Sequence, residues 1–275
     1  MKRLATAAVA VPLALAAVFR LPGPWFFLLC LVLIDWGAIE FMRLLRPALP
    51  GAPLWLLPLL VPAVALVLVL AVGEGALLPG GERWLLGALA ALPLGVGSAV
   101  LVLRTPLEEV LGALGALAFG IPYFALPIAS LYWLQQHDPW VVFLLCAIVW
   151  LGDTAALYAG TYLGRRRMAP VVSPKKTWEG AAAGFLIGVA ATAVWSFFQF
   201  GGVRWPLLAA GAGTAVAAQV GDLVESLLKR ATGVKDSGGI LPGHGGMLDR
   251  MDAMLFAAPA LLFGLWLIGV PVGRP

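Results

Sequence analysis

Charged side chains are scarce in this chain of 275 residues. Lys, Arg, Asp and Glu together make up 12% of the sequence, whereas 61% of its residues are hydrophobic. Ordinary globular domains hold about 25% charged and about 45–50% apolar residues. A soluble fold cannot bury this much apolar surface, so the composition excludes a soluble protein and indicates one whose solvent is lipid.

Cysteine is rarer still. The two cysteines, Cys30 and Cys146, both lie inside apolar segments, and the sequence contains no Cys-x-x-Cys pair and no Cys/His cluster. This pattern argues against a disulfide framework and against a zinc site. Alternation of apolar and polar residues at period two is also missing, which argues against an outer-membrane barrel.

Long apolar runs recur along the whole chain instead. A helix needs about 20 residues to cross a hydrocarbon core of about 30 Å, and nine segments approach that length. They cover residues 4–19, 24–42, 54–72, 84–103, 109–131, 139–163, 180–200, 205–228 and 251–270. The sequence predicts an all-α, polytopic membrane protein with about 8–9 transmembrane helices.

We expect one transmembrane domain over residues 1–275, in which the helices of 1–131 form a scaffold and those of 139–270 carry the catalytic residues. The first apolar segment also has the basic start, apolar middle and small residues of a signal peptide. A retained helix fits it better, because "GPWFFLLCLVLIDW" follows at once and would complete a helical hairpin.

The basic residues predict the orientation. With a cytoplasmic N-terminus, 14 of the 18 Lys and Arg residues fall on the cytoplasmic side, where membrane proteins carry their excess of positive charge. The two long polar loops, 164–179 and 229–250, then both face the cytoplasm. The bias and the short loops suggest a bacterial inner membrane. A net charge of +4 suits anionic lipid headgroups, and we expect no nucleic-acid partner.

Acidic residues in or beside the spans are candidates for function, because a charge within a span costs about 2.5–3.5 kcal/mol on insertion scales. Asp153 lies inside the sixth apolar segment, and Asp249 and Asp252 share a face where the ninth helix should begin. A helix N-cap is the simpler interpretation of Asp249. At the end of the eighth segment, four polar residues recur at helical spacing and share one helix face: Asp222, Glu225, Ser226 and Lys229. An ion pair between helices would explain Asp222 and Lys229 equally well.

Several carboxylates gathered at helix ends need cations to neutralise them. Oxygen ligands without a Cys or His cluster favour Mg²⁺ over zinc. Whether the site also binds a second cation is left open. The segment "TGVKDSGGILPGHGG" supplies six glycines that can bend closely around a ligand. Positive charges suited to phosphate oxygens surround it, namely Lys229, Arg230, Lys235 and Arg250. Together these features indicate a site that handles phosphate groups.

The loop "VVSPKKTWEG" points the same way. Ser173 and Pro174 form a good N-cap and first-turn pair, which predicts a helix with Lys175 and Lys176 in its first turn. The helix dipole disfavours cations there, so the pair makes sense if an anion binds at that helix end. The alternative is a basic flank without a ligand, which is also our interpretation of Arg165–Arg167. We expect Asp35 and Glu40 to be structural partners of Arg43 and Arg46.

Residues 226–252 resemble, position for position, the signature of the phosphatidate cytidylyltransferases (CDP-diacylglycerol synthases). The matching residues are Ser226, Leu228, Lys229, Arg230, Lys235, Asp236, Pro242, His244, Gly245, Gly246, Met247, Asp249, Arg250, Met251 and Asp252. "GDT" at 152–154 and "SPKKTWEG" at 173–180 are similar to the upstream motifs of that family. The resemblance by motif spans about residues 150–252, and elsewhere only the hydrophobic pattern matches.

The resemblance implies a reaction in which CTP and phosphatidate give CDP-diacylglycerol and pyrophosphate, with a divalent metal required. Metal ligands would then be Asp222 and Asp249, with Asp153 and Asp252 as further contributors. Phosphate groups would be held by Lys175, Lys176, Lys229 and Lys235, and Arg230 and Arg250 would contact phosphate or orient the carboxylates. Asp236 and His244 complete the catalytic set, with a phosphate contact favoured over proton transfer for His244. Ser173, Ser226, Gly245 and Gly246 complete the substrate site.

Two other functions compete with this one. A related enzyme would use CTP on another membrane lipid, such as an ether-linked lipid phosphate or a polyprenol. A transporter would use the buried charges as an ion pathway, but it would place them near the membrane midplane rather than gather its motifs on one face. A homodimer is left open.

Overall fold

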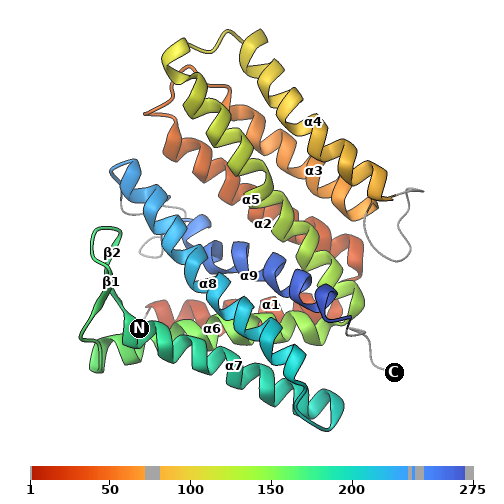
Figure 1. The fold of residues 1–275 in the computed structure, drawn as a ribbon, viewed down its shortest axis with the longest axis vertical. Helices are drawn as coiled ribbons and strands as arrows, with labels where there is room; N and C mark the ends of the chain where they lie inside the picture. The colour runs from red at the N-terminus through yellow and green to blue at the C-terminus, as the bar shows by residue number, and fades with distance from the viewer. Residues whose placement is uncertain (1, 72–80, 235–236, 239–244, 270–275) are drawn as a thin grey trace. The chain divides into compact units, whose positions relative to one another are not determined.

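The computed structural model describes residues 2–71, 81–234, 237–238 and 245–269. Lys235, Asp236 and His244, which the sequence assigns to catalysis, lie outside these described residues. Within them, each of the nine apolar segments forms an α-helix (Figure 1). The helices are α1 (Lys2–Arg20), α2 (Gly23–Leu45), α3 (Leu57–Ala71), α4 (Gly81–Val102), α5 (Val110–His137), α6 (Pro139–Tyr162), α7 (Trp178–Phe200), α8 (Trp205–Ala231) and α9 (Leu248–Leu267).

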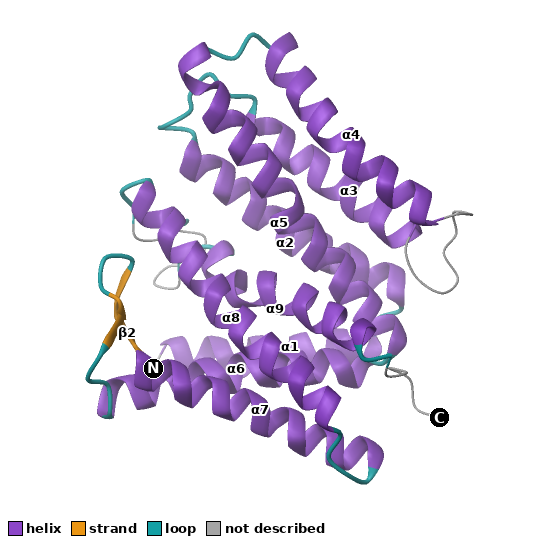
Figure 2. Ribbon diagram, viewed as in Figure 1, coloured by secondary structure: helices purple, strands orange, loops and turns teal. Residues whose placement is uncertain are grey.

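Six of the described helices are long and apolar enough to cross a membrane: α2, α5, α6, α7, α8 and α9. Short 3₁₀ turns, Leu54–Leu56 and Leu107–Glu109, precede α3 and α5. In the described part of the chain, the two β-strands form one small hairpin (Figure 2). The chain is therefore an all-α, multi-pass membrane protein.

The helix ends follow ordinary capping chemistry. Asp138 precedes α6, accepts a hydrogen bond from the Trp140 backbone N–H at 2.9 Å, and is followed by Pro139 at the first helical position. Both features stabilise a helix start. Helix α7 ends at Gly201, whose φ of 69° is left-handed, a conformation that glycine adopts without steric cost.

The loop between α6 and α7 corrects one expectation. Ser173 and Pro174 do not start a helix, because residues Ser173–Thr177 form strand β2, which pairs antiparallel with β1 (Arg167–Ala169). Proline disfavours helical backbone at the residue before it. Helix α7 starts after Thr177, whose hydroxyl accepts the Gly180 N–H at 3.2 Å. The two lysines of this loop therefore lie on a strand.

The described chain packs as two compact units. The first unit combines Met1–Phe26, Leu134–Arg230 and Asp252–Pro275, and the second combines Phe27–Trp133 and Ala231–Met251. The division of roles predicted between residues 1–131 and 139–270 stays a prediction.

In the first unit, α6 and α7 lie side by side (Figure 1). Small residues allow this close approach: a Cβ on Gly180 would lie 2.7 Å from the Ala156 carbonyl oxygen, and one on Gly184 would lie 2.9 Å from the Gly152 carbonyl oxygen. Such small residues four apart are what membrane helices use to bring their backbones together. They fix the α6–α7 pair, on which the candidate site is built.

The second unit packs α2 and α5 around large side chains. Phe41 of α2 and Phe124 of α5 are both buried, with ring centroids 5.7 Å apart. A Cβ on Gly120 of α5 would lie 3.0 Å from Phe41 and 2.8 Å from Leu57 of α3. These contacts hold α2, which carries one residue of functional interest, in a fixed position within this unit.

Candidate functional site

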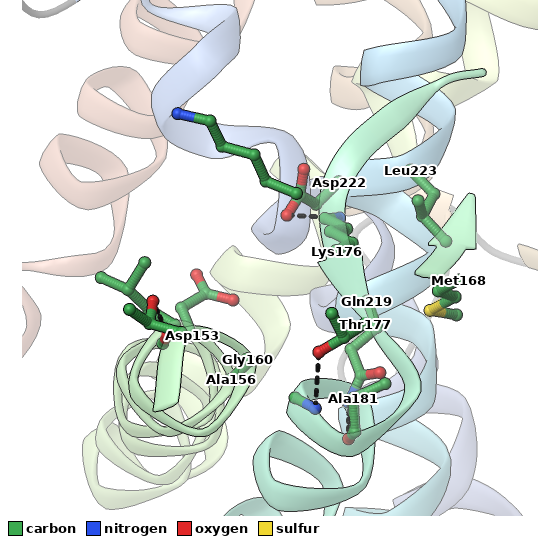
Figure 3. A pocket seen from close by; sticks show the side chains of 14 residues that line it. Asp153, Ala156, Gly160, Met168, Lys176, Thr177, Ala181, Gln219, Asp222 and Leu223 are labelled. Carbon is green, nitrogen blue, oxygen red and sulfur yellow. Dashed lines mark hydrogen bonds and ion pairs between the residues drawn. The ribbon is translucent and has the colours of Figure 1, made fainter. Parts of the chain in front are cut away.

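A cavity of about 380 Å³ lies in the first unit, bordered by α6, strand β2, the start of α7 and α8 (Figure 3). Its volume falls within the range of small-molecule sites. Charged, polar and apolar side chains all line it. The lining consists of Asp153, Ala156, Leu157, Gly160, Thr161, Met168, Lys175, Lys176, Thr177, Gly180, Ala181, Gln219, Asp222 and Leu223.

An ion pair joins two of the predicted site residues in this cavity. Lys176 Nζ of β2 lies 2.6 Å from Asp222 Oδ2 of α8, and the Asp222 carboxylate faces the lysine (Figure 3). One helical turn before Asp222, Gln219 Nε2 donates to the Ala181 carbonyl oxygen of α7 at 3.0 Å. Strand β2 and helices α7 and α8 are thereby tied together around the cavity.

Two further carboxylates surround the ion pair. Asp153 of α6 lines the same cavity, and both Asp153 and Asp252 of α9 interact electrostatically with Asp222 and Lys176. Gly221, beside Asp222, packs on the Asp252 backbone, whose carbonyl oxygen would lie 2.6 Å from a Cβ there. The structure thus brings Asp153, Asp222 and Asp252 together around one lysine. Among the described residues, no three His, Cys, Asp or Glu side chains are close enough to hold one ion between them.

The acidic stripe of α8 divides between two partners. Lys229 Nζ lies 2.6 Å from Glu225 Oε2, one turn earlier on the same helix, and the Glu225 side chain is 1% exposed. Asp222 pairs with Lys176 instead. Ser226 is half-buried on α8, and Arg230 Nε donates to the Val172 carbonyl oxygen at 3.3 Å. Lys229 and Arg230 therefore support the end of α8 and its contact with the hairpin.

A second cluster lies in the second unit, where α9 begins. Asp249 is in the first turn of α9, and its Oδ2 accepts hydrogen bonds from Gly246 N at 2.7 Å, Ser237 N at 3.1 Å and Ser237 Oγ at 2.9 Å. Gly245 has a left-handed φ of 73° and is crowded by Asp249, which would lie 2.7 Å from a Cβ there. Arg250 is exposed. Asp249 thus reaches back to its preceding loop instead of serving as the N-cap residue.

Glu40 belongs to this second cluster, contrary to expectation. Its Oε2 accepts hydrogen bonds from the Leu248 backbone N–H at 2.9 Å and from Ser237 Oγ at 3.1 Å. Neither Glu40 nor Asp35 forms an ion pair with Arg43 or Arg46 in the described residues, so the predicted pairing is wrong. The available signal was a carboxylate near the end of an apolar helix, but its partners lie 208 and 197 residues away along the chain.

The cavity in the first unit has the chemistry of a phosphate site. Lys175 and Lys176 supply cations, Asp153 and Asp222 supply hard oxygen ligands, and apolar lining residues such as Leu157 and Leu223 suit a lipid or a nucleoside. None of the described side chains in the cavity is a Cys or His nucleophile.

Comparison with known proteins gives one family match and several similar relatives. The model of the cytidylyltransferase family matches residues 1–268. The chain is 42% identical over 131 residues to the phosphatidate cytidylyltransferase of Bacillus subtilis, covering 47% of this chain and 49% of that protein. It is 36% identical over 152 residues to that of Mycobacterium tuberculosis, covering 55% and 46%. It is 39% identical over 162 residues to the phosphatidate cytidylyltransferase of Rickettsia bellii, and the match covers 55% of this chain and 70% of that protein. The matches to the first two span about half the length of those relatives.

Proposed function

The chain belongs to the cytidylyltransferase family, and on that premise we propose that it transfers the cytidylyl group of CTP to phosphatidate. The products are CDP-diacylglycerol and pyrophosphate. One observation carries the proposal: three charged residues from segments that are far apart in the sequence line one cavity. They are Asp153 of α6, Lys176 of β2 and Asp222 of α8.

The reaction joins two anions. A phosphate oxygen of phosphatidate attacks the α-phosphorus of CTP, the bond from that phosphorus to the bridging oxygen of the β-phosphate breaks, and pyrophosphate leaves with the bond's electron pair. Phosphatidate is already ionised at neutral pH, so no protein nucleophile or base is needed. The protein's task is to neutralise and orient the two anions. Lys175 and Lys176 hold phosphate oxygens, and the apolar lining residues contact the non-phosphate part of a substrate.

The residues present fit a magnesium ion. Mg²⁺ is usually bound by one or two carboxylates and completes its shell with water and substrate phosphates, which suits a pair such as Asp153 and Asp222. Asp252 adds negative charge close by. The metal-ligand role that the sequence predicts for Asp249 stays a prediction. Bound by Asp153 and Asp222, the ion would neutralise phosphate charge that lysines alone leave uncompensated. Lys176, now paired with Asp222, would then turn to the substrate phosphates.

We place the two polar loops at the cytoplasmic face. CTP is a cytoplasmic nucleotide, and 14 of the 18 Lys and Arg residues would then lie on the inner side. Of the nine described helices, six are long and apolar enough to cross a membrane. We propose that the other three also lie in or across it. Cysteine-scanning with a membrane-impermeant maleimide tests the orientation: a cysteine at exposed Val171 should be labelled from the cytoplasmic side only.

A panel of acceptors separates the proposal from its alternatives. The purified protein in vesicles is given CTP and Mg²⁺ with phosphatidate, with an ether-linked lipid phosphate, or with a polyprenol. We expect pyrophosphate release with phosphatidate at a rate at least tenfold above the other two. Faster release with the ether lipid would reassign the substrate. Transfer to the polyprenol would reassign the reaction, and solute flux without turnover would indicate a transporter.

A further inference from the structure

Glu40 is a buried carboxylate that the reaction as proposed does not use. It lies on α2 with 1% of its surface exposed. Burying a carboxylate is costly unless hydrogen bonds or charges compensate it. Among the described residues, two groups donate hydrogen bonds to Glu40, namely Ser237 Oγ and the Leu248 N–H, and both lie between α8 and the start of α9.

Two described glycines, Gly238 and Gly246, approach the Glu40 carboxylate closely. A Cβ on Gly238 would lie 2.6 Å from Glu40 Oε1, and a Cβ on Gly246 would collide with Glu40 Oε2 and Ser237 Oγ. Glycine at these two positions therefore leaves room for the Glu40 side chain. Two of the six glycines that the sequence assigns to a ligand thus contact a protein carboxylate.

One serine connects Glu40 to Asp249. Ser237 Oγ lies 3.1 Å from Glu40 Oε2 and 2.9 Å from Asp249 Oδ2. A hydroxyl carries one proton, so the two carboxylates share it. Glu40 also accepts the N–H of Leu248, the first residue of α9 and the neighbour of Asp249. A carboxylate acceptor at a helix N-terminus is favoured both by the helix dipole and by the charge-assisted bond.

We propose that Glu40 is a positioning residue for the proposed cytidylyl transfer: it holds Ser237 and the start of α9 so that Asp249 keeps one orientation. The inference rests on the proposed function for its effect on turnover, and it assigns Glu40 no contact with substrate. Glu40 is remote in sequence from every motif of the site, yet within the described residues it accepts hydrogen bonds from Ser237 and from the residue before Asp249.

The test compares Glu40→Gln, Glu40→Ala and Glu40→Asp in the full-length protein. Gln keeps an oxygen acceptor but loses the charge. We therefore expect kcat to fall about tenfold, which is about the effect of losing one charge-assisted hydrogen bond. The KM for CTP should change less than threefold. We also expect faster hydrogen exchange in peptides covering residues 245–252. The matched control is Glu109→Gln, because Glu109 Oε2 accepts the Gly51 N–H at 2.8 Å in the same unit and should change neither quantity.

A double-mutant cycle with Ser237→Ala separates positioning from general stability. If Glu40 acts through Ser237, the loss of kcat in the double variant should be smaller than the product of the two single losses. If Glu40→Ala does not fold, Glu40→Gln alone decides. The inference would be overturned if Glu40→Gln kept the wild-type kcat and the wild-type hydrogen exchange at residues 245–252. It would also be overturned if the fall in kcat were fully explained by a smaller fraction of folded protein. An inactive wild type would refute the proposed function instead, and the exchange comparison would still decide whether Glu40 orders the start of α9.

Discussion

Lys176 Nζ lies 2.6 Å from Asp222 Oδ2, with side chains that are 26% and 32% exposed. Ion pairs this accessible contribute about 0–1 kcal/mol to stability. The pair is therefore better explained by the site it lies in than by the stability of the fold. It keeps an ammonium group beside Asp153 and Asp222, where a phosphate anion would bind.

Replacing Lys176 with Gln should lower kcat/KM at least about tenfold, because a hydrogen bond to a charged group is worth about 1.5–3 kcal/mol. The melting temperature should stay nearly unchanged, since Lys176 lies on a strand and no helix dipole opposes its charge. Lys176→Arg should recover part of the activity. Arg167→Gln, on the opposite strand and exposed, is the control. Equal kinetics for Lys176→Gln and Arg167→Gln would reduce the loop to a basic flank.

Asp249→Asn should abolish turnover and leave the protein folded in detergent. The Asn side-chain oxygen can still accept the three hydrogen bonds that reach Asp249 Oδ2, but the charge that would bind a metal is lost. A Mg²⁺ titration of activity, with near-ultraviolet circular dichroism as the fold control, checks this. Near-normal activity across the titration would leave Asp249 as an anchor of its loop only.

Glu225 and Lys229 offer a test of structure against catalysis. Glu225→Gln breaks an ion pair whose acid is 1% exposed and whose Lys229 side chain is 12% exposed, and breaking such a buried pair costs about 3–5 kcal/mol. The double variant Glu225→Leu/Lys229→Met should regain stability, because apolar side chains replace a buried pair at little cost. If Lys229 also holds phosphate, the double variant stays inactive. Recovery of both stability and activity would make the pair purely structural.

Gly180→Ala should lower both the melting temperature and the activity. Its Cβ would lie 2.7 Å from the Ala156 carbonyl oxygen, so α6 and α7 must separate, and overpacking costs about 1–3 kcal/mol. Gly213→Ala in α8 is the matched control, because no atom lies within 4 Å of a Cβ there. Thermal unfolding in detergent measures both. Equal melting temperatures would show that the α6–α7 contact tolerates a methyl group.

The helices could be predicted because their signals are local. Residues 139–163 were expected as an apolar segment, and α6 covers Pro139–Tyr162 with Asp138 and Pro139 at its start. The hairpin at Arg167–Thr177 was missed, since Ser-Pro resembles a helix start and the pairing of β1 with β2 has no strong hydrophobic alternation to reveal it. Thr177, with Glu179 two residues later, was the true start signal.

The members of the site could be predicted individually, but their partners could not. Asp153 and Asp222 were identified as charges inside apolar segments, yet the pairing of Asp222 with Lys176 depends on how β2 packs against α8. Glu40 was assigned to neighbouring arginines because sequence reasoning favours partners nearby. Its hydrogen bonds to Ser237 and Leu248 depend on contacts across about 200 residues of chain.

The central claim is that the α-phosphorus of CTP is transferred to a lipid phosphate, and radiolabel position tests it most directly. The purified protein in vesicles with phosphatidate and Mg²⁺ receives CTP labelled with ³²P at either the α- or the γ-phosphate. The account predicts that α-label enters the chloroform phase as CDP-diacylglycerol while γ-label stays in the aqueous phase as pyrophosphate, in equal amounts, and that Asp222→Asn stops both. Entry of γ-label into the lipid phase, or no lipid label from either nucleotide, would contradict it.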